Sequence, residues 1–152
     1  MIIPAAPEHL EAWARLRHAL WPDEPLEKRR AECHETLAAD GADRVAFVAL
    51  ARNGAVIGFA EGSLRHDYVN GCDTSPVAFL EGIHVDPAHR ASGVGRTLVA
   101  AVEAWGAGLG CTELGSDALL ENLASHAFHA AVGFEETERV VCFRKLLNPS
   151  RP

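Results

Sequence analysis

The spacing of apolar positions predicts that the first part of the chain is helical. Over residues 7–20 the apolar side chains recur at intervals of three and four, which is typical of one face of a helix. These positions are Leu10, Trp13, Leu16 or Arg17, and Leu20. A second pattern of this kind spans residues 26–39 and is predicted to close at Asp40 and Gly41. A short strand precedes the first of these two helices.

The apolar period then changes to that of strands. The runs RVAFVAL (44–50) and AVIGFAEGSL (55–64) are rich in β-forming residues, and the Asn53-Gly54 pair between them is a strong hairpin signal. These two segments are therefore predicted to be antiparallel neighbours. A polar, turn-rich loop follows, and VAFLEGIHV (77–85) is predicted to be a third strand.

The remaining elements complete an α/β pattern. Residues 95–105 predict a helix, 112–117 a short strand, 122–133 another helix and 138–147, ERVVCFRKLL, a last strand. The order of elements predicts an α/β chain with a mixed sheet that is antiparallel in its first half.

Composition predicts one soluble domain. A chain of 152 residues that is 48% hydrophobic can bury the core of a single domain, which we assign to residues 1–147, with a C-terminal tail over 148–152. No apolar run approaches the roughly 20 residues of a membrane helix, and MIIPAAPEHLEAW does not resemble a signal peptide, so we expect a cytoplasmic protein without a membrane partner. The four cysteines lack CxxC spacing and are predicted to be small buried hydrophobic residues.

The net charge of −7 argues against a nucleic-acid partner, which needs a basic face. The short basic run EKRR (27–30) is interpreted as a solvated helix face. An acidic chain can also carry a pocket for a cationic ligand, and the positions of the acids must decide this.

The loop RASGVG (90–95) fits the pattern RxxGxG between a strand and a helix. The pattern alone favours neither a simple turn nor a ligand-binding loop. There is no GK[ST] of a P-loop, and a dinucleotide fingerprint fits poorly. A helix N-terminus with free N–H groups, glycines, and the flanking cations Arg90 and Arg96 is instead suited to a pyrophosphate.

Two segments resemble the signatures of the GNAT acyltransferase superfamily: FLEGIHVDPAHRASGVGRTLVAAVEAW (79–105) and NLASHAFHAAVGF (122–134). The resemblance implies a GNAT fold, whose mixed central sheet has splayed strands flanked by about four helices. It also implies acetyl-coenzyme A as the cosubstrate, with no metal. The implied cofactor contacts are Ile83, His84, Val85, Arg90, Ala91, Ser92, Gly93, Val94, Gly95, Arg96 and Asn122.

Within that superfamily the chain resembles the aminoglycoside 6'-N-acetyltransferases. The resemblance rests on Leu20-Trp21, on RHDYVNGCDTSPVAFLEGI (65–83) and on GFEETERV (133–140). It implies acetyl transfer to the 6'-amino group of an aminoglycoside, antibiotic resistance, and a homodimer. The implied acceptor-site residues are Trp21, Tyr68, Glu81, Asp117 and Glu138.

The residues themselves support these assignments unequally. Glu81 lies in an apolar strand, where a carboxylate is costly unless it faces a polar cleft. Asp117 suits a helix cap and a ligand contact equally well. Glu138 alone would be interpreted as solvated, and Trp21 as a core aromatic. Tyr68 stands among polar loop residues and has little core to join.

The implied chemistry assigns Glu81 as the group that receives the proton of the acceptor amine, with Asp117 as the alternative. Many superfamily members use a Tyr to protonate the thiolate, and His129 occupies that position here. The thiolate leaves unassisted or with help from His129. His126 and His129, three residues apart and without a third ligand, are weak candidates for a metal site. The alternative functions are acetylation of another small amine, of a protein N-terminus or of lysine, and acetyl-coenzyme A sensing without catalysis.

Overall fold

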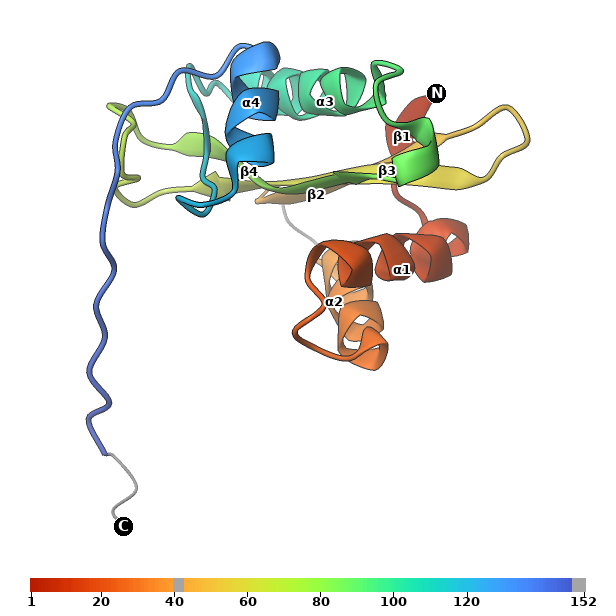
Figure 1. Ribbon diagram of the computed structural model, residues 1–152, viewed down its shortest axis with the longest axis horizontal. Coiled ribbons are helices and arrows are strands. Elements are labelled where there is room, and N and C mark those ends of the chain that lie inside the picture. The colour runs from red at the N-terminus through yellow and green to blue at the C-terminus, as the bar shows by residue number, and fades with distance from the viewer. Residues whose placement is uncertain (40–42, 149–152) are drawn as a thin grey trace.

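One five-stranded sheet runs through the molecule in the order β1-β2-β3-β4-β5 (Figure 1). The strands are β1 (Ile2–Pro4), β2 (Arg44–Leu50), β3 (Val56–Arg65), β4 (Val77–Val85) and β5 (Leu114–Ser116). The first four are antiparallel to their neighbours, and β5 runs parallel to β4. The structure is a computed structural model that describes residues 1–39 and 43–148. The predicted helix end at Asp40 and Gly41 lies outside the described residues.

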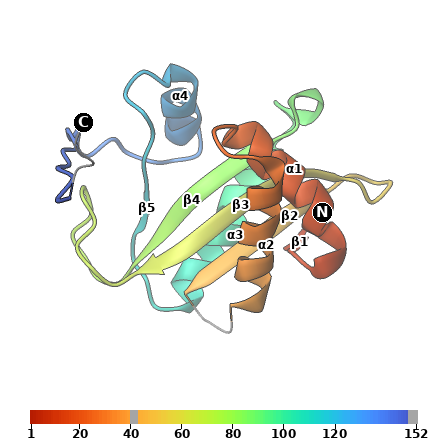
Figure 2. The same cartoon turned by 90° about the horizontal axis from the view of Figure 1, so that it is seen from below.

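Helices cover the sheet on both faces. They are α1 (Leu10–Leu20), α2 (Leu26–Ala38), α3 (Val94–Gly108) and α4 (Leu123–Ala131), with 3₁₀ turns η1 (Pro7–His9) and η2 (Pro87–His89). Figures 1 and 2 place α1 and α2 on one face, while α3 and α4 lie on the other. This mixed sheet with four α-helices is the GNAT fold that the sequence predicts. Within the described residues, no helix is long and apolar enough to cross a membrane.

The hairpin signal is confirmed. Gly54 has φ +85°, a left-handed conformation that suits glycine, and the Asn53 side chain accepts a hydrogen bond of 3.0 Å from the Ala55 N–H. The strands on either side pair antiparallel, with Phe47 opposite Ala60. The local turn chemistry therefore sets the register of β2 and β3.

The sheet separates two apolar clusters. On one face Trp13 of α1, Cys33 of α2 and Phe59 of β3 are fully buried. On the other, Leu98 and Val102 of α3 pack against the sheet. Burial of side chains of this size contributes roughly 1.5–3 kcal/mol each, so these clusters fix the helices on the sheet.

Two irregularities shape one end of β4. The register between β3 and β4 shifts at Glu61/Gly62, because Glu61 lies opposite Gly82 while Gly62 lies opposite Leu80. Glu81 is thus the extra residue of a β-bulge, which redirects its side chain. Beyond the pair Leu80–Ser116, no strand of the described residues continues the β5 edge of β4. The sheet is therefore open along residues 81–85.

The predicted strand over 138–147 is wrong for the single chain. Residues 132–146 contain no helix or strand, and Figure 1 shows this segment leaving the body of the protein. Its apolar side chains are exposed, with Phe143 at 92%. They fall in two runs, residues 140–143 and 146–147, separated by Arg144 and Lys145, and the segment pairs with none of the strands that the structure describes.

The cysteines are only partly as predicted. Cys33 is fully buried, and burial raises the pKa of its thiol to about 12. Cys72 and Cys111 are half-buried, whereas Cys142 is exposed because it lies in the C-terminal segment. All four are free thiols.

Candidate active site

The glycine loop joins β4 to α3, and its two glycines have different roles. Gly93 is the N-cap of α3 with φ +85°, and no atom lies within 4 Å of the position that a Cβ would occupy. At Gly95 a Cβ would lie 2.9 Å from Cε1 of Phe128, so this glycine makes room for α4. Gly93 therefore leaves its backbone accessible, while Gly95 serves helix packing.

The start of α3 has the features of an anion site. No side chain caps it, and its first backbone bond runs from Thr97 N to Gly93 O. The N–H groups before Thr97 belong to the first turn, which an α-helix leaves without intrahelical partners. With the positive end of the helix dipole, they suit the phosphates of a coenzyme.

The two flanking arginines brace this loop. Arg90 donates from Nε to the carbonyl of Val85 at 2.9 Å, and Arg96 donates from Nη2 to the carbonyl of Ala131 at 2.6 Å. Each keeps further N–H groups for a ligand. His84, near the end of β4, has its pKa lowered by burial and by the charge of Arg90, which favours the neutral imidazole.

The open edge of β4 contains the predicted contacts Ile83, His84 and Val85. Because no strand of the described residues pairs with this edge, its backbone groups are available for a ligand with amide groups. The edge leads directly into the glycine loop. The predicted cofactor positions on β4 and in the loop therefore form one continuous surface.

Glu81 lies on the face of the sheet that also carries α1, beyond the end of that helix. Its carboxylate accepts hydrogen bonds from Ser63 Oγ at 2.6 Å and from Arg65 Nη2 at 2.8 and 2.9 Å. The side chain is 34% exposed. The bulge thus places a charged carboxylate at the surface, with Ser63 and Arg65 of β3 to hold it, which avoids the cost of burying it in the strand.

Asp117 follows the last residue of β5 directly. Since Leu80 lies opposite Ser116 in the parallel pair, Glu81 and Asp117 are the next residues on two diverging strands. Asp117 is exposed, and the cap of α4 is Asn122, whose side chain accepts from Ser125 N at 3.2 Å. The cap interpretation of Asp117 is therefore wrong, and Asp117 lies where β4 and β5 begin to separate.

Tyr68 and Glu138 lie near one loop. Tyr68 is 75% exposed in the loop between β3 and β4. In the same loop, a Cβ at Gly71 would lie 2.2 Å from Thr137 Oγ1 and 3.8 Å from Cβ of Glu138. The residues after α4 thus cross the Tyr68 loop of their own chain, and Glu138 is exposed there.

Glu113 fixes this loop, a role that no sequence pattern indicates. Its carboxylate accepts from the N–H groups of Asp73 at 2.9 Å and Thr74 at 2.7 Å, and from the Thr74 hydroxyl. The Thr74 side-chain and backbone hydrogen bonds hold the pKa of Glu113 below its ordinary value. The loop that carries Tyr68 is therefore tied to the start of β5.

Trp21, the residue after α1, packs on the core and also reaches the bulge. Its ring lies 6.3 Å from that of Phe59, edge to face. A Cβ at Gly82 would lie 2.4 Å from Trp21 Cη2. The indole therefore lies against the residue that follows Glu81, so that the core and the acceptor-site interpretations of Trp21 are compatible.

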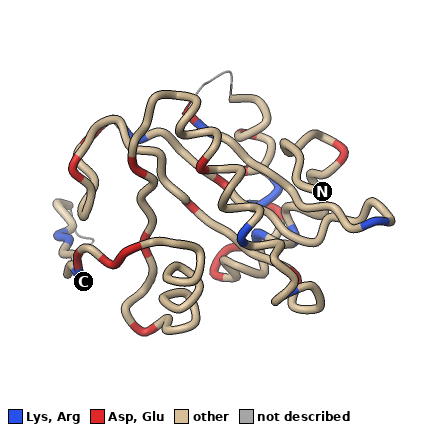
Figure 3. Tube along the Cα trace, turned by 90° about the horizontal axis from the view of Figure 1, so that it is seen from above, with Lys and Arg blue, Asp and Glu red and all other residues tan. Residues whose placement is uncertain are grey.

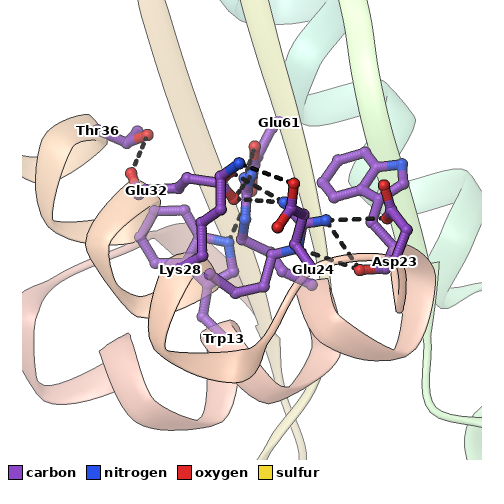
Figure 4. A network of polar contacts seen from close by, with 10 residues as sticks. Trp13, Asp23, Glu24, Lys28, Glu32, Thr36 and Glu61 are labelled. Atoms are coloured by element: carbon purple, nitrogen blue, oxygen red, sulfur yellow. Dashed lines mark hydrogen bonds and ion pairs between the residues drawn. The ribbon is translucent and has the colours of Figure 1, made fainter. Parts of the chain in front are cut away.

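A group that sequence reasoning missed lies beneath α1 and α2, and we call it the buried ion network. Arg17 pairs with Glu61 and, at 2.8 Å, with Glu32, which also accepts two hydrogen bonds of 2.9 Å from Arg29. Trp13 Nε1 donates to Glu61 at 2.9 Å (Figure 4). The interpretation of residues 27–30 as a solvated face is wrong for Arg29, which is 6% exposed. A glutamate in an apolar strand, as at Glu61, was the available signal.

His129 is held by polar contacts to two serines, Ser116 and Ser125. Its Nε2 lies 2.7 Å from Ser116 Oγ, and its Nδ1 lies 2.7 Å from the carbonyl oxygen of Ser125. The carbonyl can only accept, so Nδ1 carries the proton and, in the neutral ring, Nε2 accepts from the Ser116 hydroxyl. His129 therefore connects α4 to the end of β5, beside the opening of the sheet. No group of three or more metal-ligating side chains occurs within residues 1–39 and 43–148.

Charge is unevenly distributed around these features. Figure 3 shows many acidic positions along the side of the molecule that carries the C-terminal segment. The carboxylates predicted for the acceptor site belong to Glu81, Asp117 and Glu138, whereas Arg90 and Arg96 flank the glycine loop. This division suits a cationic acceptor at one end and an anionic coenzyme at the other.

Comparison with known proteins agrees with this geometry. The sequence profile of the acetyltransferase (GNAT) family matches residues 9–134. An aminoglycoside N(6')-acetyltransferase type 1 from Stenotrophomonas maltophilia is 54% identical over 149 residues, 96% of this chain and 93% of that protein. One from Salmonella enteritidis is 53% identical over 90% of this chain and 92% of its own length.

Solved structures of such proteins have the same fold. AAC(6')-Iy in complex with a bisubstrate analogue, CoA-S-monomethyl-acetylneamine, gives a TM-score of 0.89 at 50% identity and covers 96% of this chain and 97% of its own. AAC(6')-Ih from Acinetobacter baumannii gives 0.91 at 44% identity and covers 97% and 99%. Profile, sequence and fold agree over nearly the whole length. The chain therefore belongs to the acetyltransferase (GNAT) family.

Proposed function

We propose that this protein transfers the acetyl group of acetyl-coenzyme A to the 6'-amino group of aminoglycoside antibiotics and so confers resistance to them. The observation that carries the proposal is the similarity to N(6')-acetyltransferases over nearly the entire chain. The acidic opening supports it, because aminoglycosides carry several ammonium groups and Glu81 and Asp117 are complementary to them in sign.

The donor end supports binding of acetyl-coenzyme A. Gly93 adopts a left-handed conformation with open space around it, at a helix start that no side chain caps. The pyrophosphate would accept hydrogen bonds from the first turn of α3, and Arg90 and Arg96 would contribute charge. The open edge of β4 over residues 83–85 would bond the amide groups of the pantetheine arm, with the thioester near the end of β5.

The reaction proposed is direct attack of the amine on the thioester carbonyl. Alkyl ammonium groups titrate near roughly 10, so the acceptor must lose a proton before or during the attack. Glu81 receives it, directly or through water, and Asp117 is the alternative base on the adjacent strand. The C–N bond forms, the C–S bond breaks, and the electron pair leaves on sulfur. Holding amine and thioester together supplies much of the rate.

A backbone N–H in the open part of β4, between Ile83 and Val85, is the proposed donor to the developing oxyanion. The thiolate then leaves as such or takes a proton from the side of His129. Protonated His129 would donate from Nε2 to Ser116, whose hydroxyl would pass a proton on to sulfur. The 2.7 Å contact between these two atoms supports such a path.

The test is thiol release from acetyl-coenzyme A in the presence of an aminoglycoside that bears a 6'-amine. An otherwise identical aminoglycoside with a 6'-hydroxyl is the control. Release with the amine alone is expected. Equal release with both compounds, or none with either, would contradict the 6'-N assignment.

Two further acceptor classes separate this function from its rivals. A peptide with a free N-terminus and a lysine side chain tests for a protein acetyltransferase. Binding of acetyl-coenzyme A without thiol release from any amine would indicate a sensing domain. We expect release with the peptide to remain at the level of the blank.

We further propose that the protein is a cytoplasmic homodimer. Supply of acetyl-coenzyme A inside the cell supports the location. The dimer is supported by the exposed apolar side chains of the C-terminal segment, which a second copy would cover. They are Val140, Val141, Phe143, Leu146 and Leu147.

Sedimentation equilibrium of the full chain tests the dimer. We expect a single species of twice the chain mass, and a shift toward monomer when Phe143 and Val141 are both replaced by Asp. The matched control is Glu135→Asp, which alters the same segment without adding charge. A monomeric wild-type chain at micromolar concentration would contradict the proposal.

A further inference from the structure

Trp21 is held by two arginines that lie outside the acceptor opening. Arg29 donates from Nε and Nη2 to the Trp21 carbonyl, at 3.1 and 2.9 Å. The guanidinium carbon of Arg17 lies 4.8 Å from the centroid of the indole, within the range of a cation–π interaction. Gly82 leaves the space into which the ring projects. The backbone and the ring of Trp21 are thus both fixed from the side of the buried ion network.

The buried ion network has no net charge, and most of its side-chain surface is buried. The side chains of Arg17, Arg29 and Glu61 are 10%, 8% and 11% exposed, and that of Glu32 is 25% exposed. Burial works against the charge of Arg17, but attraction and hydrogen bonds from Glu61 and Glu32 outweigh it, and the pKa of Arg17 is raised. Such a buried group of ion pairs contributes little net stability compared with apolar packing.

A costly network with fixed geometry can serve orientation rather than stability. Here the network connects α1, α2 and β3, and two of its members, Arg17 and Arg29, contact Trp21. Figure 4 shows labelled members of both helices and of β3 meeting at one place. The residue held is the one whose indole lies against Gly82, next to Glu81.

We propose that Arg29 is a positioning residue for acceptor binding. Through its bonds to Glu32 and to the Trp21 carbonyl, it keeps the indole against Gly82, where the ring forms a wall of the acceptor opening. Arg29 itself does not touch the substrate. This assignment rests on the proposed function, because Trp21 is taken to line the acceptor site.

Replacement of Arg29 leaves an excess negative charge in the network, but each remaining charge keeps a partner. The Arg29 partner Glu32 keeps Arg17, and the other partner, Asp23, is 79% exposed. Replacement of Arg29 by Met preserves much of the side-chain length but removes both hydrogen bonds to Trp21. Lys retains the charge, yet it lacks the planar fork that bonds Glu32 and the carbonyl together.

The first experiment compares steady-state kinetics of Arg29→Met, Arg29→Lys and Arg30→Met. Arg30 is the next residue of α2 and also pairs with α1, at 2.7 Å from Glu11, but on the surface. We expect Arg29→Met to raise KM for the aminoglycoside about tenfold and KM for acetyl-coenzyme A less than twofold, with Arg29→Lys between it and the wild type. Arg30→Met should behave like the wild type.

The second experiment follows Trp21 itself by ¹⁹F NMR after incorporation of 5-fluorotryptophan. The resonance absent from Trp21→Phe identifies the residue. Arg29→Met should shift or broaden this resonance and leave that of Trp105 on α3 in place. Gly82→Ala, which pushes directly on the ring, should move the same resonance.

The outcomes separate positioning from a general structural role. An unchanged aminoglycoside KM in Arg29→Met, or an equal rise of both KM values with a shift of every ¹⁹F resonance, would overturn the proposal. If the wild type acetylates no aminoglycoside, the proposed function fails. In that case the resonance of Trp21 still decides whether Arg29 positions it, because that measurement needs no acceptor.

Discussion

Glu61 and Glu81 are carboxylates on the same face of neighbouring strands, yet their surroundings differ completely. Glu61 lies under α1 and is bonded by Arg17 and Trp13. Glu81 lies beyond that helix, at a bulge, with Ser63 and Arg65 beside it and solvent in front. One sheet face thus has a covered half and an open half. Whether a helix covers the carboxylate therefore determines whether it is enclosed in buried ion pairs or lies at the surface.

The largest effect is expected when the covered carboxylate is changed. Glu61→Gln keeps the shape but removes one of the two carboxylate partners of the buried Arg17 and leaves the network with an excess positive charge, which should cost about 3 kcal/mol and lower Tm by roughly 6–12 °C. Thermal unfolding measures this. Glu11→Gln removes an exposed partner of Arg30 and should leave Tm nearly unchanged. Equal melting temperatures for the two variants would contradict the expectation that the covered carboxylate matters more for stability than an exposed one.

The open carboxylate should affect turnover instead. Glu81→Gln is expected to lower kcat about 100-fold, because the amine loses its proton acceptor, while Tm remains that of the wild type. Kinetics with saturating acetyl-coenzyme A measure the loss. Asp117→Asn is the companion variant. A larger loss in Asp117→Asn than in Glu81→Gln would transfer the role of base to Asp117.

A smaller effect is expected at the donor end. Gly93→Val adds a Cβ at φ +85° beside the cofactor surface and should raise KM for acetyl-coenzyme A about tenfold. Gly110 is a matched control, since it has φ +89° and equally open surroundings but follows α3. Gly110→Val should carry the same backbone strain without the rise in KM. An unchanged KM in Gly93→Val would refute the role of this loop in binding the pyrophosphate.

The smallest effect is expected when Glu113 is protonated at low pH. The pKa of Glu113 is below its ordinary value of 4.5 in the folded chain, so its contribution to holding the Tyr68 loop is complete above that value and is lost as the pH falls through the lowered pKa. Amide exchange at Asp73 and Thr74 should therefore accelerate in that acidic window. Glu113→Gln should show fast exchange already at neutral pH. If protection of these two amides changed neither with pH nor in Glu113→Gln, Glu113 would not hold the Tyr68 loop.

Local signals predicted the fold well where the partner is near in sequence. The bounds of β2 and β4 follow from apolar runs, and the Asn53-Gly54 turn sets the hairpin. The strand expected over 138–147 failed for a reason of the same kind. Its apolar residues are consistent with a strand, but a strand needs a partner, and none of the described strands pairs with this segment.

The acceptor region could be only half predicted. Glu81 was recognisable as a charge in an apolar strand, but the bulge that exposes it depends on the register with β3. The apolar pattern leaves Arg17 ambiguous and the basic run predicts a solvated Arg29, because the partners of both are set by how α1 and α2 pack on Glu61. Charge pairing across the fold leaves no periodic signal in the sequence.

The contact between Gly95 and Phe128 joins two motifs that are about thirty residues apart. Because a Cβ at position 95 would meet the Phe128 ring at 2.9 Å, a larger residue in the loop requires a smaller one on α4. The two motifs therefore cannot drift independently during evolution. Substitutions at these positions are expected to be tolerated in pairs and selected against singly, which a library that varies both codons together would reveal.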